Sequence, residues 1–231
     1  MLPSEFPEVQ SSLNLKRLLA VQVDMQFGDL RTLLQLPKVE SEGGCNLTAA
    51  AVLFNLIAGS SVCFYEASAS VFTERRDRGA RFVEMLRSFY PWADEDLTGE
   101  EGAGFLYDSA RNPVTHSLGL DPSAAGATRK EVKLRKWALS SAQISELEES
   151  EHRPAWSGKT ISEVERTGST ITKASISIPA LYWGVHRMLA ALFRDTRQVQ
   201  KAEALAAEFS YLWPQYSSGG AFITVFRRRR R

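Results

Sequence analysis

This sequence is poor in the residues that build most metal and disulfide sites. It holds two cysteines and three histidines among 231 residues. Neither Cys45 nor Cys63 has another cysteine or histidine at metal-binding spacing, so we predict two reduced core thiols and no metal site. Phosphate-binding loops, dinucleotide-binding glycine patterns and nucleophile elbows are also missing, and we therefore expect no cofactor.

The sequence also lacks a net charge that would point to a partner. Its 28 lysines and arginines balance 27 aspartates and glutamates, for a formal charge of +1. Five of the basic residues form the run Arg227–Arg231, to which we assign no site. The first residues, with Glu5 and Glu8, do not follow the basic-then-apolar order of a secretory leader, so we expect a cytoplasmic protein.

One long stretch, residues 43–65, has no charged residue at all. In length it is sufficient to cross a bilayer. It also contains Asn46, Asn55 and three glycines, and a helix buried inside a bundle has the same composition. We predict a buried helix and no membrane association; a membrane span is the alternative.

Apolar residues recur at three- and four-residue steps through much of the chain, which indicates helices. We predict helices over 12–36, 46–66, 78–90, 102–113, 179–193 and 197–212. Alternating segments at 131–139, 159–166 and 170–178 predict strands, the last two forming a hairpin at Thr167-Gly168. The fold class is therefore mainly α, a helical bundle with an inserted small antiparallel β-sheet. The expected parts are a flexible arm (1–11), the bundle (12–120), a linker and β insertion (121–178), returning helices (179–216) and a basic tail (217–231).

The run Arg111-Asn112-Pro113-Val114-Thr115-His116 ends the fourth expected helix. An arginine can hold a phosphate and neutralise charge that develops on its oxygens. A histidine can take or give the proton when the 2′-hydroxyl of RNA attacks the neighbouring phosphate. Residues five apart in a regular helix point about 140° apart. We therefore expect Pro113 to kink or end the helix and to bring Arg111 and His116 together.

This arrangement, an arginine followed directly by a polar residue and then by a histidine after four intervening residues, resembles the signature of the HEPN superfamily. The resemblance covers about residues 44–120. It implies a metal-independent endoribonuclease, or a toxin- or defence-type RNA-binding protein, that acts as a homodimer on single-stranded RNA. It also implies roles for three residues: Arg111 clamps phosphate, His116 is the acid–base group, and Asn112 orients or hydrogen-bonds.

A purely structural interpretation of the same run stays open. Arg111 can pair with a carboxylate such as Asp108, His116 can cap a helix end, and Asn112-Pro113 can be a turn. The chain is then a non-enzymatic helical protein-interaction module.

Basic residues gather in two further places. Arg129, Lys130, Lys133 and Arg135 lie along the first expected strand and are candidates for nucleic-acid binding, although lysines on an exposed strand also block edge pairing. The second group can hold RNA phosphates, or can be a solvated helix face paired with Glu74, Asp77 and Glu84. It consists of Arg75, Arg76, Arg78, Arg81 and Arg87.

On the expected helix 179–193, two aromatic residues are each followed one helical turn later by a basic or imidazole side chain. Tyr182 precedes His186, and Trp183 precedes Arg187. We predict core packing for the first pair and a cation–π contact for the second. His152, before Pro154, is expected to be solvated.

Overall fold

The helices expected from the sequence are present wherever the structure describes the chain. A computed structural model describes residues 22–37, 45–64, 77–116 and 130–200, so the arm (1–11) and the basic tail (217–231) lie outside the described residues. The fold class is confirmed as mainly α with a small sheet. In chain order the elements are α2 (Gln22–Gln35), α3 (Asn46–Phe64), α4 (Asp77–Phe89), α5 (Gly99–Phe105), the π-helix η2 (Leu106–Arg111), α6 (Asn112–His116), β1 (Glu131–Arg135), α7 (Ser141–Glu149), the 3-10 helix η4 (Ala155–Ser157), β2 (Ile161–Thr167), β3 (Thr170–Ser177) and α8 (Ile178–Arg194).

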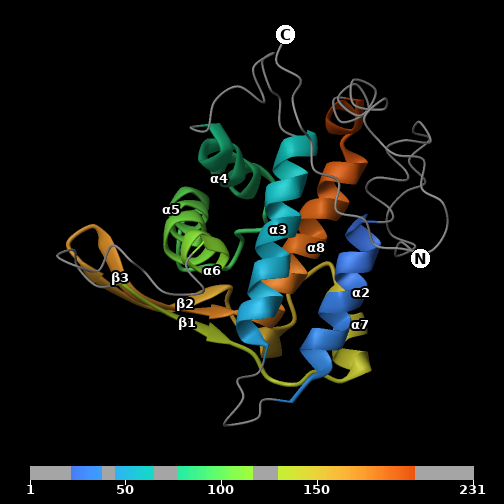
Figure 1. The fold of residues 1–231 in the computed structure, drawn as a ribbon, viewed down its shortest axis with the longest axis horizontal. Coiled ribbons are helices and arrows are strands. Elements are labelled where there is room, and N and C mark those ends of the chain that lie inside the picture. The colour runs from blue at the N-terminus through green and yellow to red at the C-terminus, as the bar shows by residue number, and fades with distance from the viewer. Residues whose placement is uncertain (1–21, 38–44, 65–76, 117–129, 201–231) are drawn as a thin grey trace.

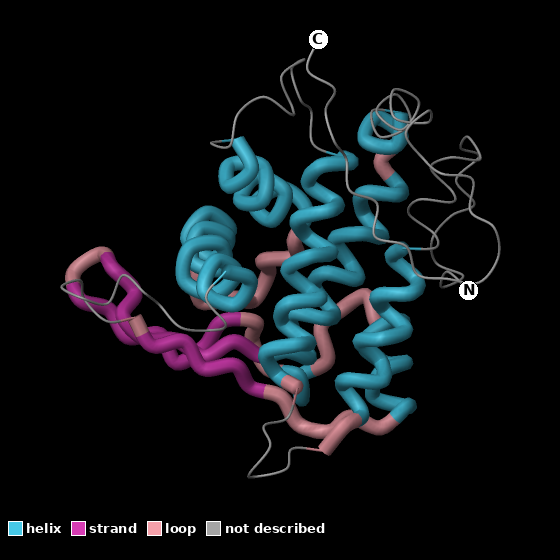
Figure 2. The backbone as a smooth tube through the Cα atoms, in the orientation of Figure 1, coloured by secondary structure: helices cyan, strands magenta, loops and turns pink. Residues whose placement is uncertain are grey.

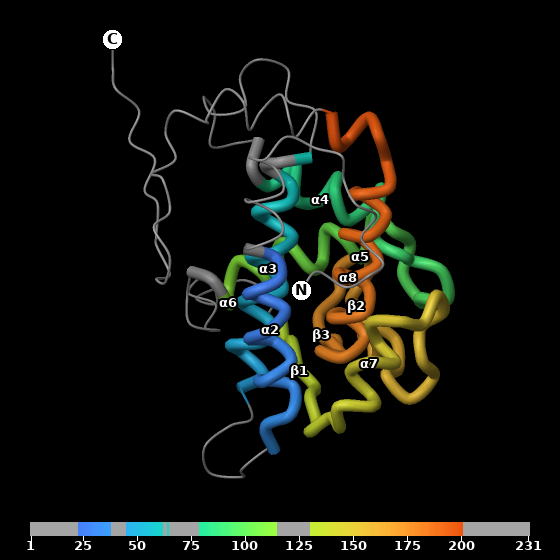
Figure 3. Tube along the Cα trace, turned by 90° about the vertical axis from the view of Figure 1, so that its right-hand side faces the viewer, coloured from blue at the N-terminus to red at the C-terminus, as the bar shows by residue number. Residues whose placement is uncertain are grey.

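Two long helices, α3 and α8, pack against each other at the centre (Figure 1). α2 lies along α3, and α7 lies along α8 (Figure 3). Most residues of α8 are buried, and α3 has no charged residue. α3 is not buried all round, in contrast to the buried helix predicted from the sequence: one face, with Leu47, Thr48, Asn55 and Gly59, is exposed although it carries no charge. Among the described helices, none is both long and apolar enough to span a bilayer.

Short polar motifs fix where several helices begin. Thr98 and Glu101 form a reciprocal capping box at the start of α5, and Ser140 and Gln143 form another at the start of α7. Each box satisfies backbone N–H groups that have no partner within the helix. The side chain of Ser177 caps α8, whose first turn contains a proline.

The sheet is mixed, which differs from the antiparallel sheet expected from the sequence. Its strand order is β1-β3-β2, with β2 antiparallel to β3 and β1 parallel to β3. The physical reason is the long connection that contains α7 and η4, because a parallel neighbour needs a crossover of a dozen or more residues. β2 and β3 form the predicted hairpin, which projects from the helical body together with β1 (Figure 2). The turn is Gly168-Ser169, one residue later than expected, and Gly168 has a φ of 61°.

β1 alternates as predicted. Glu131, Lys133 and Arg135 are exposed, whereas Val132 and Leu134 are half-buried. Lys136, the next inward position, is buried, and its Nζ donates to the carbonyl of Leu36 over 2.7 Å. This contact ties the end of the strand to the end of α2.

Candidate functional site

Arg111 is the last residue of the π-helix η2, directly before α6. Its Nη1 donates to Oδ1 of Asn112 over 2.9 Å, and its Cζ lies 5.6 Å from the ring centroid of Tyr107. Tyr107 packs in turn against Phe82 of α4, with ring centroids 5.4 Å apart. Two neighbours therefore orient the half-buried guanidinium, and one of them is anchored to the core.

Pro113 does not end the helix, although ending it was one of the two outcomes expected from the sequence. It is the second residue of α6, and the helical backbone continues from η2 through it. The N–H of Asn112 bonds to the carbonyl of Tyr107, five residues back, as in a π-helix. We attribute the uninterrupted helix to this wider turn, which relieves the clash between a proline ring and the preceding turn. Isolated π-turns in proteins are frequently found at functional sites.

The structure describes only part of the predicted catalytic set. His116 ends α6 in backbone, but its side chain lies outside the described residues. Arg129 also lies outside them. The relation between the Arg111 guanidinium and the His116 imidazole therefore stays a prediction.

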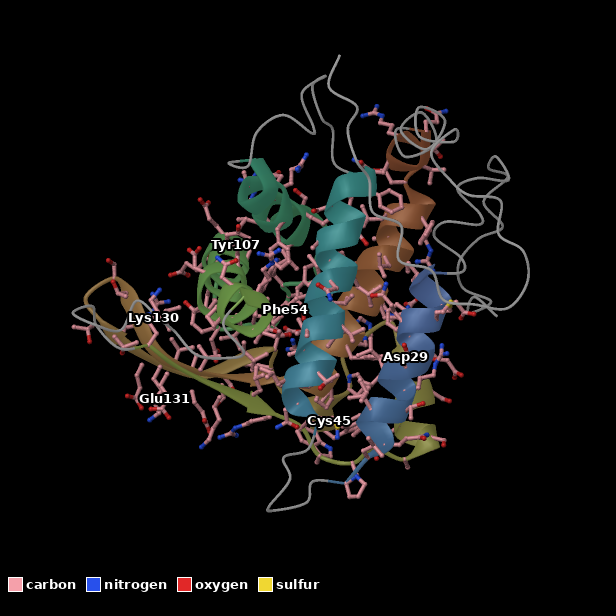
Figure 4. All side chains as sticks on the ribbon, in the orientation of Figure 1. Asp29, Cys45, Phe54, Tyr107, Lys130 and Glu131 are labelled. Atoms are coloured by element: carbon pink, nitrogen blue, oxygen red, sulfur yellow. The ribbon has the colours of Figure 1, made fainter. Side chains whose placement is uncertain are left out.

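Lys130 lies beside the same π-helix, on a different side from Arg111. Its Nζ is 3.2 Å from Oγ of Ser109. Residues two apart on a helix point in nearly opposite directions, so Ser109 and Arg111 do not share a face. Figure 4 shows Tyr107 on the helical stretch and Lys130 below it, at the sheet. The structure thus brings one predicted nucleic-acid-binding residue to η2, but not onto the face of Arg111.

The other two strand residues belong to a face of mixed charge. Arg135 pairs with Glu163 of β2, and Lys133 lies close enough to Glu163 to lower the pKa of its carboxyl. The main cause of that lowered pKa is the hydrogen bond from Ser175, 2.6 Å long. Lys173 of β3 binds Glu165 over 2.7 Å and lies in register with Glu131. The basic residues of β1 therefore belong to a sheet surface on which positive and negative side chains face each other from different strands.

The arginine group around α4 is divided. Arg87 pairs with Glu84 over 2.7 Å on the surface, as the solvated-face interpretation predicts. Arg81 is instead buried, at 4% exposure, so that interpretation is wrong for this residue. Arg75 and Arg76, together with the side chain of Arg78, lie outside the described residues.

A polar cluster that the sequence did not reveal joins α2, α7 and α8. Glu148 accepts a hydrogen bond from Nε of Arg31, 2.7 Å away, and another from the hydroxyl of Tyr182. Burial of Tyr182 raises the pKa of its hydroxyl, so that it is a donor to the carboxylate. The partners of Glu148 lie on helices that are far from it in the sequence, so no local residue pattern predicts these contacts.

His186 lies next to this cluster, fully buried. The predicted core packing is confirmed, because Phe27 meets both the Tyr182 and the His186 rings edge-on at 5.3 Å. The contact expected for Trp183 involves a different cation. Arg153 lies 5.9 Å above the Trp183 ring, whereas Arg187 donates to the backbone carbonyl of Glu148. His152 is exposed, as expected.

A second buried ion pair, also unforeseen, connects the loop before α5 to the start of the hairpin. Glu95 pairs with Arg153 and accepts from the backbone N–H of Thr160 over 2.9 Å. The hydroxyls of Thr160 and Tyr90 are 2.6 Å apart. Every group here has a protein partner, so we assign the cluster a structural role.

Within the described part of the chain, no three His, Cys, Asp or Glu residues come together as candidate metal ligands. Cys45 is a free, half-buried thiol and not a core residue, and the side chain of Cys63 lies outside the described residues. Searches against protein-family models, curated proteins and solved structures return no match to this chain. The functional interpretation of the candidate site therefore depends on the residues of this chain alone.

Proposed function

We propose that this chain is a HEPN-like, metal-independent endoribonuclease that acts as a homodimer on single-stranded RNA. The observation that supports this best is the fixed guanidinium of Arg111. Asn112 accepts a hydrogen bond from it and the Tyr107 ring lies beside it, at the last residue of a π-helix. A pre-oriented arginine loses little conformational freedom when it binds a phosphate.

The reaction needs only groups of the motif and of the substrate. The 2′-hydroxyl of one nucleotide attacks the adjacent phosphorus, and the bond from phosphorus to the 5′-oxygen breaks. One proton leaves the 2′-oxygen and one is delivered to the departing 5′-oxygen, which yields a 2′,3′-cyclic phosphate and a 5′-hydroxyl. His116 is the proton-transfer group, supplied by each protomer, and Arg111 neutralises charge on the phosphate oxygens.

The remaining candidate residues act as contacts to the RNA backbone. Lys130 is exposed beside η2, and Arg129 precedes it in the chain. Lys133 and Arg135 extend the row along β1, but Glu163 already opposes both. We therefore assign the larger share of backbone binding to Arg129 and Lys130.

The test uses the full chain, a labelled single-stranded RNA and an excess of chelator. Wild type is expected to cut the RNA to cyclic-phosphate ends. His116→Ala is expected to lower kcat by at least about 100-fold, and Arg111→Ala to lower it comparably. Arg87→Ala, which removes a surface arginine paired with Glu84, is the matched control and should cut at the wild-type rate.

Two results would overturn the proposal. One is equal cutting by wild type and His116→Ala, which would identify a contaminating nuclease. The other is no cutting by a folded, dimeric wild type over a broad panel of RNA sequences. Light scattering gives the oligomeric state, and circular dichroism shows that each variant is folded.

A further inference from the structure

Trp137, between β1 and α7, is 39% exposed, which is unusual for so large an aromatic residue. Its ring meets that of Trp156 in η4 at an interplanar angle of 73°, with centroids 6.4 Å apart. Trp156 is half-buried and therefore fixed. The two rings form a corner on the surface, with one ring supporting the other.

A carboxylate completes this corner. Nε1 of Trp156 donates to Oε2 of Glu146 on α7 over 2.8 Å. Glu146 is exposed, as are Glu149 and Glu151 farther along. Residues 137–151 contain four glutamates and neither lysine nor arginine. Glu148 is paired with Arg31, and its backbone carbonyl at the helix end accepts from Arg187, so the acidic character of this surface comes from the exposed Glu146, Glu149 and Glu151.

The corner lies at a different place from the proposed RNA site. Arg111 belongs to η2 and packs toward α4, whereas Trp137 follows β1 and leads into α7. The segment with Trp137 runs beside the end of α2, where Leu139 N–H donates to the carbonyl of Leu34 over 2.9 Å. Leu36, at that same end, is 41% exposed and adds apolar surface.

We propose that Trp137, Trp156 and Glu146 form a docking surface for an arginine-bearing segment of a partner protein. A guanidinium stacks on an indole face by cation–π and planar contact, and its N–H groups can reach a carboxylate at the ring edge. The exposed carboxylates of Glu146 and Glu149 attract such a segment and repel the RNA backbone. Tryptophans are also frequent among the few interface residues that contribute most of the binding free energy in protein complexes.

The choice of arginine over lysine follows from the geometry of the corner. A lysine ammonium is a compact, strongly hydrated charge, and it gives up more hydration to lie on an indole than a guanidinium does. A peptide with arginine is therefore expected to bind more tightly than the same peptide with lysine. One with glutamate in those positions is expected not to bind.

The experiment titrates the full chain with a synthetic peptide of alternating arginine and serine and measures binding by calorimetry at low salt. Trp137→Ala is expected to raise Kd about tenfold. Glu146→Gln is expected to raise it several-fold and to reduce its dependence on salt. Met25→Ala removes an exposed apolar residue of α2 elsewhere and is the matched control. Arg111→Ala should leave the affinity unchanged, which separates this surface from the RNA site.

Three results would overturn the proposal. The first is equal affinity of wild type and Trp137→Ala for the peptide. The second is equal affinity for the arginine and glutamate peptides. The third is binding only after Arg227–Arg231 are replaced by serine, which would identify this chain's own arginine run as the occupant in place of a partner protein.

Discussion

Arg31 on α2 donates from Nε to Oε1 of Glu148 on α7 over 2.7 Å, although 117 positions separate the two residues in the chain. The same carboxylate oxygen accepts from the hydroxyl of Tyr182 on α8. One side chain therefore joins three helices.

Glu148→Ala is expected to lower the free energy of unfolding by about 2 kcal/mol. Most of the loss comes from the buried Tyr182 hydroxyl, which is left without its acceptor. The share of Arg31 is smaller because water reaches a third of its side chain. Urea unfolding measures the change. Glu149→Ala, an exposed neighbour, is the control and should stay within about 0.5 kcal/mol of wild type. Equal effects of both substitutions would show that Glu148 does not stabilise the fold more than an exposed glutamate does.

His186 predicts how stability depends on pH. Burial lowers the pKa of its imidazole to about 4, with Arg187 and Arg31 adding to that and Glu148 opposing it. The unfolded chain keeps a value of about 6.5. Between these pH values the unfolded state binds more protons, so the free energy of unfolding falls as pH drops from 6.5 toward 4.

The expected loss from His186 across that window is on the order of 3 kcal/mol. Stability curves for wild type and His186→Asn, measured from pH 7.5 to 4.5, isolate this contribution from that of the carboxylates. The variant is expected to show the shallower slope. Parallel curves would mean that His186 titrates alike in both states.

Gly184 on α8 allows Tyr90 to approach the helix closely. A Cβ at position 184 would lie 2.1 Å from Cζ of Tyr90, which also holds Thr160. Gly184→Ala is therefore expected to cost about 2–3 kcal/mol, even though alanine favours helix by about 1 kcal/mol. Gly28→Ala on α2 meets nothing within 4 Å and should stabilise. Thermal unfolding of both variants checks the opposite signs, and stabilisation by Gly184→Ala would contradict this packing.

Glu95 and Arg153 form a buried pair, with side chains 1% and 11% exposed. Glu95→Gln leaves a buried guanidinium without its counter-charge and is expected to cost about 3 kcal/mol. Asp96→Asn removes the adjacent exposed pair with Lys159, and its expected cost is below about 1 kcal/mol. Guanidinium chloride screens surface charge, so urea is the denaturant of choice. A small effect of Glu95→Gln would show that the pair is dispensable.

Local patterns were enough to predict the long helices and the three strands, because apolar spacing reflects which face of an element is buried. The alternation expected over 131–139 continues to Lys136, which is buried in the structure. The parallel partner of β1 was not predictable, since pairing depends on the path of a long connection and not on the strand itself. Pro113 shows a similar limit, because the π-turn that accommodates it is formed by backbone bonds without a sequence signature.

The candidate site was predictable only as residue types. The resemblance gave Asn112 an orienting or hydrogen-bonding role without naming its partner, and in the structure its Oδ1 accepts from Nη1 of Arg111 over 2.9 Å. Lys133 and Arg135 are exposed on β1 as expected, but Glu163, which opposes them, comes from β2, 28 positions after Arg135. Charge along a strand does not reveal what lies across the sheet. The ion pairs of Glu95 and Glu148 were missed for the same reason.

Strand order also decides when each part of the sheet assembles. β2 and β3 are joined by the two-residue turn Gly168-Ser169, so the two strands can pair within microseconds. β1 meets β3 only after the chain has closed a loop that contains α7, η4 and β2, a slower event with a larger entropic cost. The hairpin is thus a template onto which β1 is added late. Truncating Leu134 will accelerate unfolding far more than it slows folding.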